Sequence, residues 1–357
     1  MTKQKPDFPA MQGPVCPMPL PHDKTIVLGH GSGGKMTFDL ISRYFYPTFE
    51  NQVLLRGDDA AVLDLGDSGR LAFSTDSHIV SPLFFPGGDI GRLAVAGTVN
   101  DLAMVGAKPQ WLTAAFILEE GFDMHQLADV LTSMSHTAAE AGIKIVAGDT
   151  KVAEKGKADG LFINTTGLGI IPIGRDVSGA NAQAGDAVLI SGTVGDHGIA
   201  VLAARGGLAF EAEVVSDVAP VNGVVEALFE AGIDVRVLRD PTRGGVATTL
   251  NEIAKQSGVG IVLEEGTIPV REPVVAACEM LGFDPLYVAN EGKLVAIVPE
   301  NQAEAALKAM RATRYGQDAV RIGTVEAEPE GRVLMETAIG GTRMVDVLAG
   351  EILPRIC

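Results

Sequence analysis

The sequence has few cysteines, no excess of basic residues and no long apolar run, and each absence excludes a class of protein. Cys16, Cys278 and Cys357 lie far apart without paired spacing, so neither a disulfide framework nor a zinc cluster is predicted. The formal net charge of −17 argues against broad binding to the phosphate backbone of nucleic acids. No apolar stretch approaches the ~20 residues that span a membrane.

The composition that remains is that of a globular protein. With 46% hydrophobic residues the chain can form a packed core, and its 357 residues exceed one typical core, so two domains are expected. Residues 1–24 are rich in proline and lack the apolar core of a secretion signal, which predicts a flexible extension and a cytoplasmic location.

The order of the expected elements indicates two α/β or α+β domains. In the first unit we expect strands at 25–28, 53–55, 60–65, 70–76, 143–147 and 161–170, and helices at 89–106 and 125–141. After a linker at 175–180 we expect strands at 187–190, 259–263, 293–298, 320–325 and 332–336, and helices near 197–205, 221–231, 244–257, 271–281 and 301–312.

A glycine-rich loop with a lysine, Gly31-Ser32-Gly33-Gly34-Lys35, follows the first expected strand. Glycines let backbone N–H groups approach phosphate oxygens closely, and an ammonium adds positive charge. The loop does not match the Walker pattern, and an ordinary glycine-rich turn before a helix is the alternative.

Aspartates at the ends of elements form a more specific pattern. Asp58 and Asp59 stand at a tight turn, Asp76 ends an apolar strand, Asp101 interrupts a helix of small apolar residues, and Asp149 follows an apolar segment. Mg²⁺ takes a few carboxylates together with phosphate oxygens, so the set suits a metal–nucleotide site. Any one aspartate could instead cap a helix or turn, although Asp101 resists that alternative because it lies within a helix.

Other polar residues accompany these aspartates. Asn100 could orient a phosphate, and Lys151 would share one face of an extended segment with Asp149, either near an anionic reaction centre or in a surface ion pair. The turn from Asp240 to Gly245 could bind anions through Arg243. Asn290-Glu291-Gly292 could present a carboxylate at a cleft edge or could be an ordinary hairpin turn.

Three further residues have less specific readings. His197 has no partner at metal-ligand spacing, so a cap or surface role is expected. Trp111 is expected in the core, and Cys278 is expected to be a buried small side chain on a helix.

The last residue, Cys357, follows a short segment with two glycines, Gly340 and Gly341, that could act as a hinge. A cysteine at the chain end could carry a chemical group on its sulfur between two sites. A frayed terminus that happens to end in cysteine is the alternative.

Taken together, these motifs resemble the aminoimidazole ribonucleotide synthetase (PurM-like) superfamily over about residues 25–340. The resemblance rests on segments 31–35, 57–62, 74–76, 100–107, 148–150 and 239–245, which occur in the order of that superfamily. Within it, the His30–Lys35 start and the Pro354-Arg355-Ile356-Cys357 end are similar to a family of hydrogenase maturation proteins.

The resemblance implies a fold and a reaction. The fold would have an ATP-binding and dimerisation domain at 25–175, pairing through its strands in a homodimer, an α/β domain at 181–340 and a mobile tail at 341–357. A HypF-like carbamoyltransferase would load the sulfur of Cys357. ATP-dependent dehydration of the thiocarboxamide would then give a thiocyanate, the cyanide donor for the iron of [NiFe]-hydrogenase on a HypC–HypD-like scaffold.

Residue roles also follow from the resemblance. Cys357 would carry the group, Glu291 would take the amide protons, and Lys151 would lie beside the reacting sulfur. Contacts to ATP would come from Lys35, Asp58, Asn100 and Asp149, and ligands to Mg²⁺ from Asp59, Asp76 and Asp101.

Other functions compete with this interpretation. A selenophosphate synthetase or a thiamine-monophosphate kinase would use the same aspartates, but the former would want cysteine or selenocysteine in the glycine loop, where Ser32 stands, and neither needs a terminal cysteine. A non-catalytic scaffold that binds nucleotide and docks a metallocentre partner is the alternative from another class.

Overall fold

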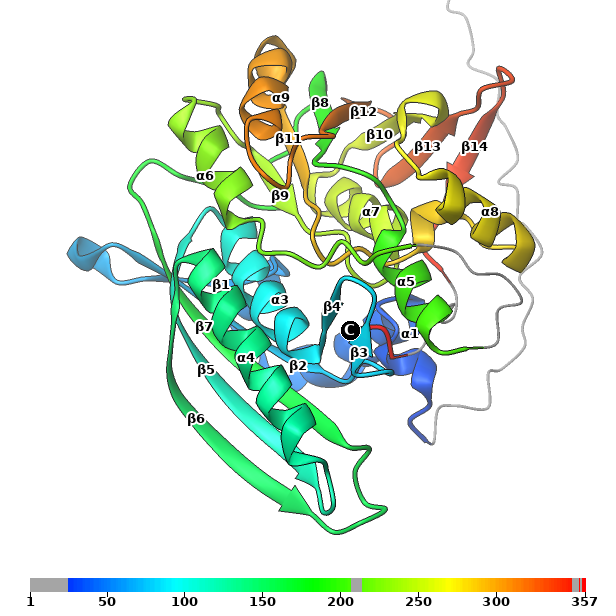
Figure 1. Ribbon diagram of the computed structural model, residues 1–357. Coiled ribbons are helices and arrows are strands. Elements are labelled where there is room, and N and C mark those ends of the chain that lie inside the picture. The colour runs from blue at the N-terminus through cyan, green and yellow to red at the C-terminus, as the bar shows by residue number, and fades with distance from the viewer. Residues whose placement is uncertain (1–24, 207–213, 349–352, 354) are drawn as a thin grey trace, which may run out of the picture.

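Two β-sheets, each covered by helices, make up the computed structural model, which describes residues 25–206, 214–348, 353 and 355–357 (Figure 1). The predicted proline-rich extension and Cys16 lie outside the described residues. No helix in the described part of the chain is long and apolar enough to cross a membrane.

The first sheet is mixed and has the strand order β1-β2-β7-β5-β6. Its strands are β1 (Ala61–Asp64), β2 (Arg70–His78), β5 (Lys108–Glu119), β6 (Lys144–Ala153) and β7 (Leu161–Ile171). All neighbouring pairs are antiparallel except β5 and β6, which run parallel. Burial alternates along β7, so one face of this sheet is covered and the other is open.

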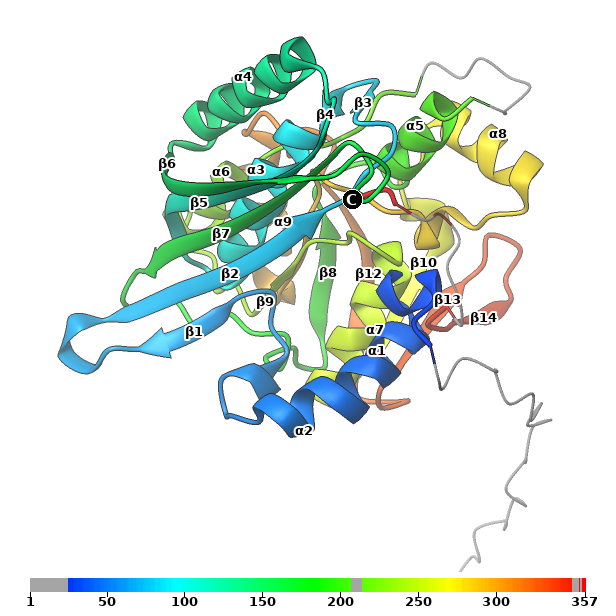
Figure 2. The ribbon, with the colours of Figure 1, turned by 90° about the horizontal axis from the view of Figure 1, so that it is seen from below.

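Two helices, α3 (Ile90–Met104) and α4 (Met124–Ala141), cover one face of the first sheet, as Figure 2 shows from below. Each begins at an aspartate whose carboxylate accepts hydrogen bonds from backbone N–H groups of the first turn, Asp89 for α3 and Asp123 for α4. Between the sheet and α5 lies the short hairpin β3 (Phe84–Phe85) and β4 (Gly88–Asp89).

The second sheet has the order β14-β13-β10-β12-β8-β11-β9. Its strands are β8 (Asp186–Ile190), β9 (Val237–Arg239), β10 (Gly260–Glu264), β11 (Val295–Pro299), β12 (Val320–Glu326), β13 (Arg332–Glu336) and β14 (Thr342–Val345). β8 is buried throughout, because Val188 and Ile190 face one hydrophobic cluster while Ala187 and Leu189 face another.

Helices lie on both faces of this second sheet. α7 (Gly245–Ser257) packs on one face, and α6 (Asn222–Glu230) and α9 (Ala303–Arg311) pack on the other. α5 (Asp196–Ala204) contacts both β3 and α8 (Glu272–Leu281), and both helices share a hydrophobic cluster with α3. The expected mixed α/β architecture with two units is therefore confirmed.

Short helices rather than strands precede the first sheet. Leu28–Gly31 and Leu54–Arg56 are 3₁₀ turns, so the strands expected at 25–28 and 53–55 are wrong. Between these two turns lie α1 (Lys35–Leu40), a π-helical segment (Ile41–Phe45) and α2 (Tyr46–Phe49). The apolar residues that suggested strands remain exposed, as Leu28 shows.

Of two further expectations, on Cys278 and Trp111, the first is confirmed and the second is wrong. Cys278 is buried in α8, and burial raises the pKa of its thiol to about 11, which confirms an inert side chain. Trp111 lies on β5 with 41% of its surface exposed, so its expected place in the core is wrong. β5 itself was not expected, because its apolar and polar residues alternate only in part.

The segment predicted as a tail begins with β14, which the sequence did not predict and which pairs antiparallel with β13. The final residues return to the first domain: the backbone carbonyl of Cys357 accepts a hydrogen bond from Ile79 N, and that of Arg355 accepts one from Ser81 N. In Figure 1 the chain end therefore lies between the two sheets.

The close approach of α3 to β7 depends on Gly167. A methyl group there would lie 2.7 Å from both Leu102 Cδ1 and Thr98 Cγ2 and 3.0 Å from Leu112 Cδ2. We expect Gly167→Ala to lower the free energy of unfolding by about 1–3 kcal/mol through overpacking. Gly223→Ala, in α6 with open space around it, is the control and should be neutral or stabilising by up to about 1 kcal/mol. Equal urea midpoints for Gly167→Ala and the parent would contradict this packing.

Candidate functional site

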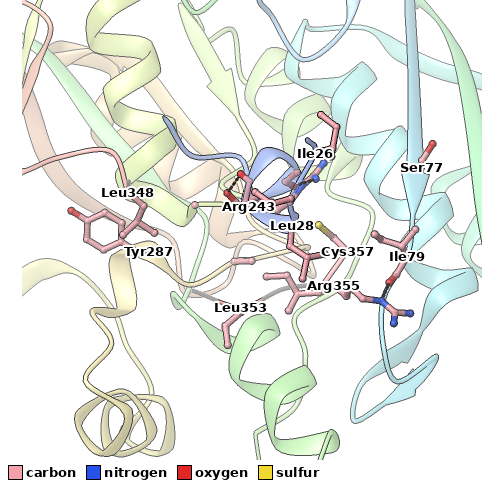
Figure 3. Close-up of a pocket in the computed structure, with 17 residues that line it drawn as sticks. Ile26, Leu28, Ser77, Ile79, Arg243, Tyr287, Leu348, Leu353, Arg355 and Cys357 are labelled. Atoms are coloured by element: carbon pink, nitrogen blue, oxygen red, sulfur yellow. Dashed lines mark hydrogen bonds between the residues drawn. The ribbon is translucent and has the colours of Figure 1, made fainter. Parts of the chain in front are cut away.

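A cavity of about 900 Å³ opens where the two domains meet, and the chain end lines it (Figure 3). The glycine-rich loop forms one wall, Ser77 and Ile79 at the end of β2 form another, and Arg243 precedes α7. Gly33 must lack a side chain here, because its φ is +77° and a methyl group would lie 2.8 Å from Arg243 Cβ. The loop is thus packed directly against the second domain.

The thiol of Cys357 is held inside this cavity. The thiol is half-buried there, and the Glu291 carboxyl and Arg243 are both near enough to act on its charge. Burial raises the pKa of the thiol far above its usual range, Arg243 opposes the shift, and Glu291 and Asp76 add to it. A docked Cys357 is therefore a protonated thiol and a poor nucleophile.

Glu291 lies in the turn before β11 with only 4% of its surface exposed. Its backbone N–H donates to Asp217 Oδ1 at 3.1 Å, and its carbonyl accepts from Asn100 Nδ2 at 3.4 Å. Burial raises the pKa of its carboxyl well above the ordinary value, Asp240, Asp217 and Asp76 add to the increase, and Arg243 opposes it. Glu291 Oε1 is buried without a hydrogen-bond partner, so the site can still accept a proton donor there.

A cluster of acidic side chains adjoins Glu291. Asp101 on α3 accepts a hydrogen bond from Ser74 Oγ at 2.6 Å, and Asp59 forms an ion pair with Arg239. Burial raises the pKa values of Asp101 and Asp240 well above normal, and repulsion from neighbouring carboxylates, Asp59 and Asp76 among them, raises both further. A cation nearby would favour the ionised forms of these carboxyls and so lower their pKa values again.

A magnesium ion was expected from Asp59, Asp76 and Asp101. Within the residues described, no group of three or more His, Cys, Asp or Glu side chains is placed to hold a metal ion. Asp59 is engaged by Arg239, which leaves Asp76 and Asp101 as the carboxylates that fit. Mg²⁺ commonly takes one or two protein carboxylates with phosphate oxygens and water, so the donor chemistry suits the ion when phosphates complete its shell.

Asp58 and Asn100, which were expected to contact ATP, form hydrogen bonds within the protein instead. Asp58 accepts hydrogen bonds from Ser178 Oγ and Gly179 N, which fastens the linker between the domains. Asn100 Oδ1 accepts from Val221 N at 2.8 Å, and its amide nitrogen donates to Ala219 O at 3.1 Å. Both residues therefore brace the domain junction. Lys35 opens α1, directly after the loop that lines the cavity.

Lys151 and Asp149 lie apart from the other residues of the expected site. Both are on β6, where the Lys151 ammonium bonds both carboxylate oxygens of Asp149 and the lysine side chain is 72% exposed. β6 is separated from β2 by β5 and β7, which places its backbone roughly 14 Å away. Within one chain, Lys151 is not brought beside Cys357.

Three residues of the site were not singled out from the sequence. Arg239 and Asp240 appeared there only as part of a polar turn, although charged residues directly after the apolar Val237-Leu238 were a usable signal. His197 was expected as a cap or surface residue, and that expectation is wrong. It is 0% exposed, and its Nε2 lies 2.6 Å from the carbonyl oxygen of Ile356.

Comparison with known proteins identifies the family of this chain. Residues 57–171 match the family described as AIR synthase related protein, N-terminal domain, and residues 183–336 match its C-terminal domain. The chain thus belongs to the AIR synthase related proteins. Thiamine monophosphate kinase from Aquifex aeolicus, with a TM-score of 0.62 and 21% identity over 84% of this chain and 96% of that one, shares the fold alone.

More similar proteins define the family within that class. Carbamoyl dehydratase HypE of Azotobacter vinelandii is 55% identical over 93% of this chain and 97% of its own, and that of Escherichia coli K12 is 47% identical over 93% and 99%. A structure of a HypE–HypF complex has a TM-score of 0.83 with 52% identity over 87% of this chain and 99% of that chain. A structure of HypE with ATP has a TM-score of 0.78 with 54% identity over 93% and 100%. The chain belongs to the carbamoyl dehydratase HypE family of hydrogenase maturation proteins.

The raised pKa of Glu291 has a consequence for stability. The folded state binds this proton more tightly than the unfolded chain, whose carboxyl has a pKa near 4.5. The contribution to the free energy of unfolding is therefore complete below about pH 4.5 and is lost as pH rises towards the folded pKa. Glu291→Gln cannot ionise, so we expect its melting temperature relative to the parent to rise by about 2–4 °C or more between pH 5 and pH 8.

The exposed Glu154→Gln on the first domain serves as the control, and its difference from the parent should stay constant across the same pH range. Thermal melts followed by circular dichroism at both pH values provide the comparison. An equal difference in melting temperature between Glu291→Gln and the parent at pH 5 and pH 8 would show that burial does not raise the pKa of this carboxyl.

Proposed function

We propose that this chain dehydrates a carbamoyl group carried on its own Cys357, with ATP as the phosphoryl donor, and so supplies a thiocyanate for hydrogenase maturation. The observation that carries the proposal is the Cys357 thiol against the Glu291 carboxyl, inside a cavity that the glycine-rich loop also lines. The carbamoyl dehydratase relatives give the reaction, and this geometry supports the residues that perform it.

The proposed chemistry removes one water from the thiocarboxamide in two steps. The amide oxygen attacks the γ-phosphorus of ATP, which forms an O–P bond, breaks the bond to ADP and leaves a phosphorylated imidate. The nitrogen gives up one proton as this imidate forms. Loss of phosphate then breaks the C–O bond while the nitrogen gives up its second proton, and a C≡N bond results. Phosphate is a much better leaving group than oxide, so one difficult step becomes two easier ones.

Glu291 is the proposed acceptor of the amide protons. Its Oε1 lacks a partner although it is buried, and the N–H groups of a thiocarboxamide on Cys357 would supply one. A general base works best when its pKa lies near the working pH, and burial moves the pKa of Glu291 in that direction. Arg243 lies near the same atoms and could balance the anion that forms.

Loading and dehydration would use different positions of the tail. The pKa of the docked thiol is held far above its usual range, so this thiol is unsuited to attack a carbamoyl donor. We therefore propose a mobile tail that leaves the cavity to be loaded by a HypF-like carbamoyltransferase and returns for dehydration. A HypC–HypD-like scaffold would receive the cyanide, and the cytoplasm would keep the thiol reduced.

The nucleotide would lie between the glycine-rich loop and the buried carboxyls beside the cavity. Lys35 and the glycine-rich loop are the proposed phosphate contacts, and Asp76 and Asp101 the proposed ligands of Mg²⁺, with Asp59 joining them only after release by Arg239. Bound Mg²⁺ would neutralise charge on the transferring phosphoryl group. Asp58 and Asn100 support this site by bracing the domain junction.

A homodimer would place Lys151 and Asp149 beside the site of the second copy. The open face of the first sheet exposes apolar side chains on several strands, and β6 is exposed along its length, which suits pairing with a second copy. The patch includes Phe73, Trp111, Ile117 and Ile170. We propose that Lys151 lies beside the reacting group in the site of the second copy. We also propose domain bounds of 25–175 and 181–340. Sedimentation at the monomer mass at micromolar concentration would contradict this arrangement.

Cys357→Ala separates the carrier from the nucleotide site. We expect no carbamoyl loading of this variant by the carbamoyltransferase, because the accepting sulfur is gone. ATP binding should stay unchanged because the nucleotide contacts lie on other residues. Intact mass spectrometry measures loading, and Cys278, buried in α8, provides the internal control. Loading at any other residue would overturn the assignment.

Glu291→Gln and Asp101→Asn are expected to fail at different points of the reaction. Glu291→Gln should be loaded normally but should lose water about 100-fold more slowly or worse, since it lacks a base. Asp101→Asn should weaken the magnesium dependence of ATP turnover. Single-turnover mass spectrometry of the loaded chain measures both. Native rates for Glu291→Gln would remove it as the base, and unchanged turnover in Asp101→Asn would leave that residue a structural role.

A further inference from the structure

Both domains donate hydrogen bonds to the backbone carbonyls of the last three residues. The carbonyl of Arg355 accepts from Ser81 N at 3.1 Å and from Arg205 Nη2 at 2.7 Å, and the carbonyl of Cys357 accepts from Ile79 N at 3.2 Å. Between them, the carbonyl of Ile356 accepts from His197 Nε2 at 2.6 Å. The peptide group directly before Cys357 is thus held by one side chain, His197.

The protonation of His197 follows from its two partners. A carbonyl oxygen only accepts, so Nε2 must carry the hydrogen that bonds Ile356. Nδ1 lies 2.8 Å from Ser216 Oγ, and this hydroxyl accepts from Val218 N at 3.1 Å, which leaves its own hydrogen for Nδ1. Burial lowers the pKa of His197, in keeping with a neutral ring. Ser216 therefore selects the tautomer that can hold the tail.

The surroundings of His197 fit the tail closely. Its ring meets the Phe85 ring edge to face, with 5.4 Å between centroids. The next residue, Gly198, has no room for a side chain, since a methyl group would lie 2.5 Å from Val288 Cγ1 and 3.3 Å from Leu353 Cδ1. Leu353 and Ile356 are themselves buried in the hydrophobic cluster that surrounds α5.

The docked tail also has a backbone conformation that is unfavourable without supporting contacts. Arg355 has φ of 55°, in the left-handed region that non-glycine residues rarely occupy. Contacts must hold this conformation in place, and an undocked tail would relax from it. The hydrogen bonds to the three carbonyls are contacts of this kind.

We propose that His197, held by Ser216 in its Nε2–H tautomer, is a positioning residue that binds the Ile356 carbonyl and so sets the sulfur of Cys357 against Glu291. The inference rests on the proposed dehydration for its purpose, although tail docking itself is independent of that reaction. His197 contacts neither the sulfur nor ATP, so it acts through the Ile356–Cys357 peptide. Carbamoyl loading, which needs the tail outside the cavity, does not depend on it.

The test compares two substitutions in the full-length chain. His197→Phe keeps an aromatic ring beside Phe85 but removes both hydrogen bonds, and His197→Gln retains an N–H donor near the position of Nε2. His125→Phe, an exposed histidine on α4, is the matched control. The first readout is the alkylation rate of Cys357 by iodoacetamide in the unloaded protein, measured on the C-terminal peptide. The second is the rate of water loss from the loaded tail, beside the rate of loading.

We expect alkylation of Cys357 to be about 2- to 10-fold faster in His197→Phe, as loss of one buried hydrogen bond predicts. Water loss should slow by about tenfold with loading unchanged, and His197→Gln should restore most of both. Parent-like alkylation in His197→Phe would overturn the proposal, as would loading that falls as much as water loss. If the parent loses no water, the proposed function fails, and the alkylation rates still decide whether His197 docks the tail.

Discussion

The structure depends on the placement of two groups side by side where the domains meet, the half-buried thiol of Cys357 and the buried carboxyl of Glu291. In bulk water neither would keep its proton so firmly, and the shift arises mainly because the meeting point of the two domains excludes solvent. Surrounding carboxylates strengthen the effect and Arg243 opposes it. Both groups therefore hold their protons to higher pH than they would in water.

The domain junction maintains that environment. Arg239 ties Asp59 to the second domain, and Asn100 links α3 to both the 219–221 segment and the carbonyl of Glu291. These buried polar groups are satisfied across the junction, so separating the domains would leave several of them without partners. Rigid support of this kind fits a site in which a mobile group, rather than the enzyme core, must move.

Much of this arrangement was readable from the sequence because its signals are local. The apolar periodicity of α4 and α7, the mid-helix Asp101 and the ordered motifs of the superfamily predicted the elements, the fold and the family. The terminal position of Cys357 also indicated a carrier. The strands expected at 25–28 and 53–55 failed because short apolar runs do not distinguish strands from turns.

The remaining features depend on contacts between distant segments. His197 looked like a surface residue because its partners, Ser216 and Ile356, are 19 and 159 residues away. Asp58 and Asn100 carried the right chemistry for a ligand, but their hydrogen bonds go to the domain junction. Lys151 lies on an exposed edge strand, and only a second copy would give it a place beside a site.

The proposed dehydration requires a loaded Cys357 to take the position that the unloaded Cys357 has in this structure. The most direct measurement is a single-turnover reaction of the loaded full-length chain with ATP and Mg²⁺, followed by peptide mass spectrometry and by ADP release. The account predicts that the C-terminal peptide loses one water per ADP formed. ADP formation with the carbamoyl mass still present on Cys357 would contradict it.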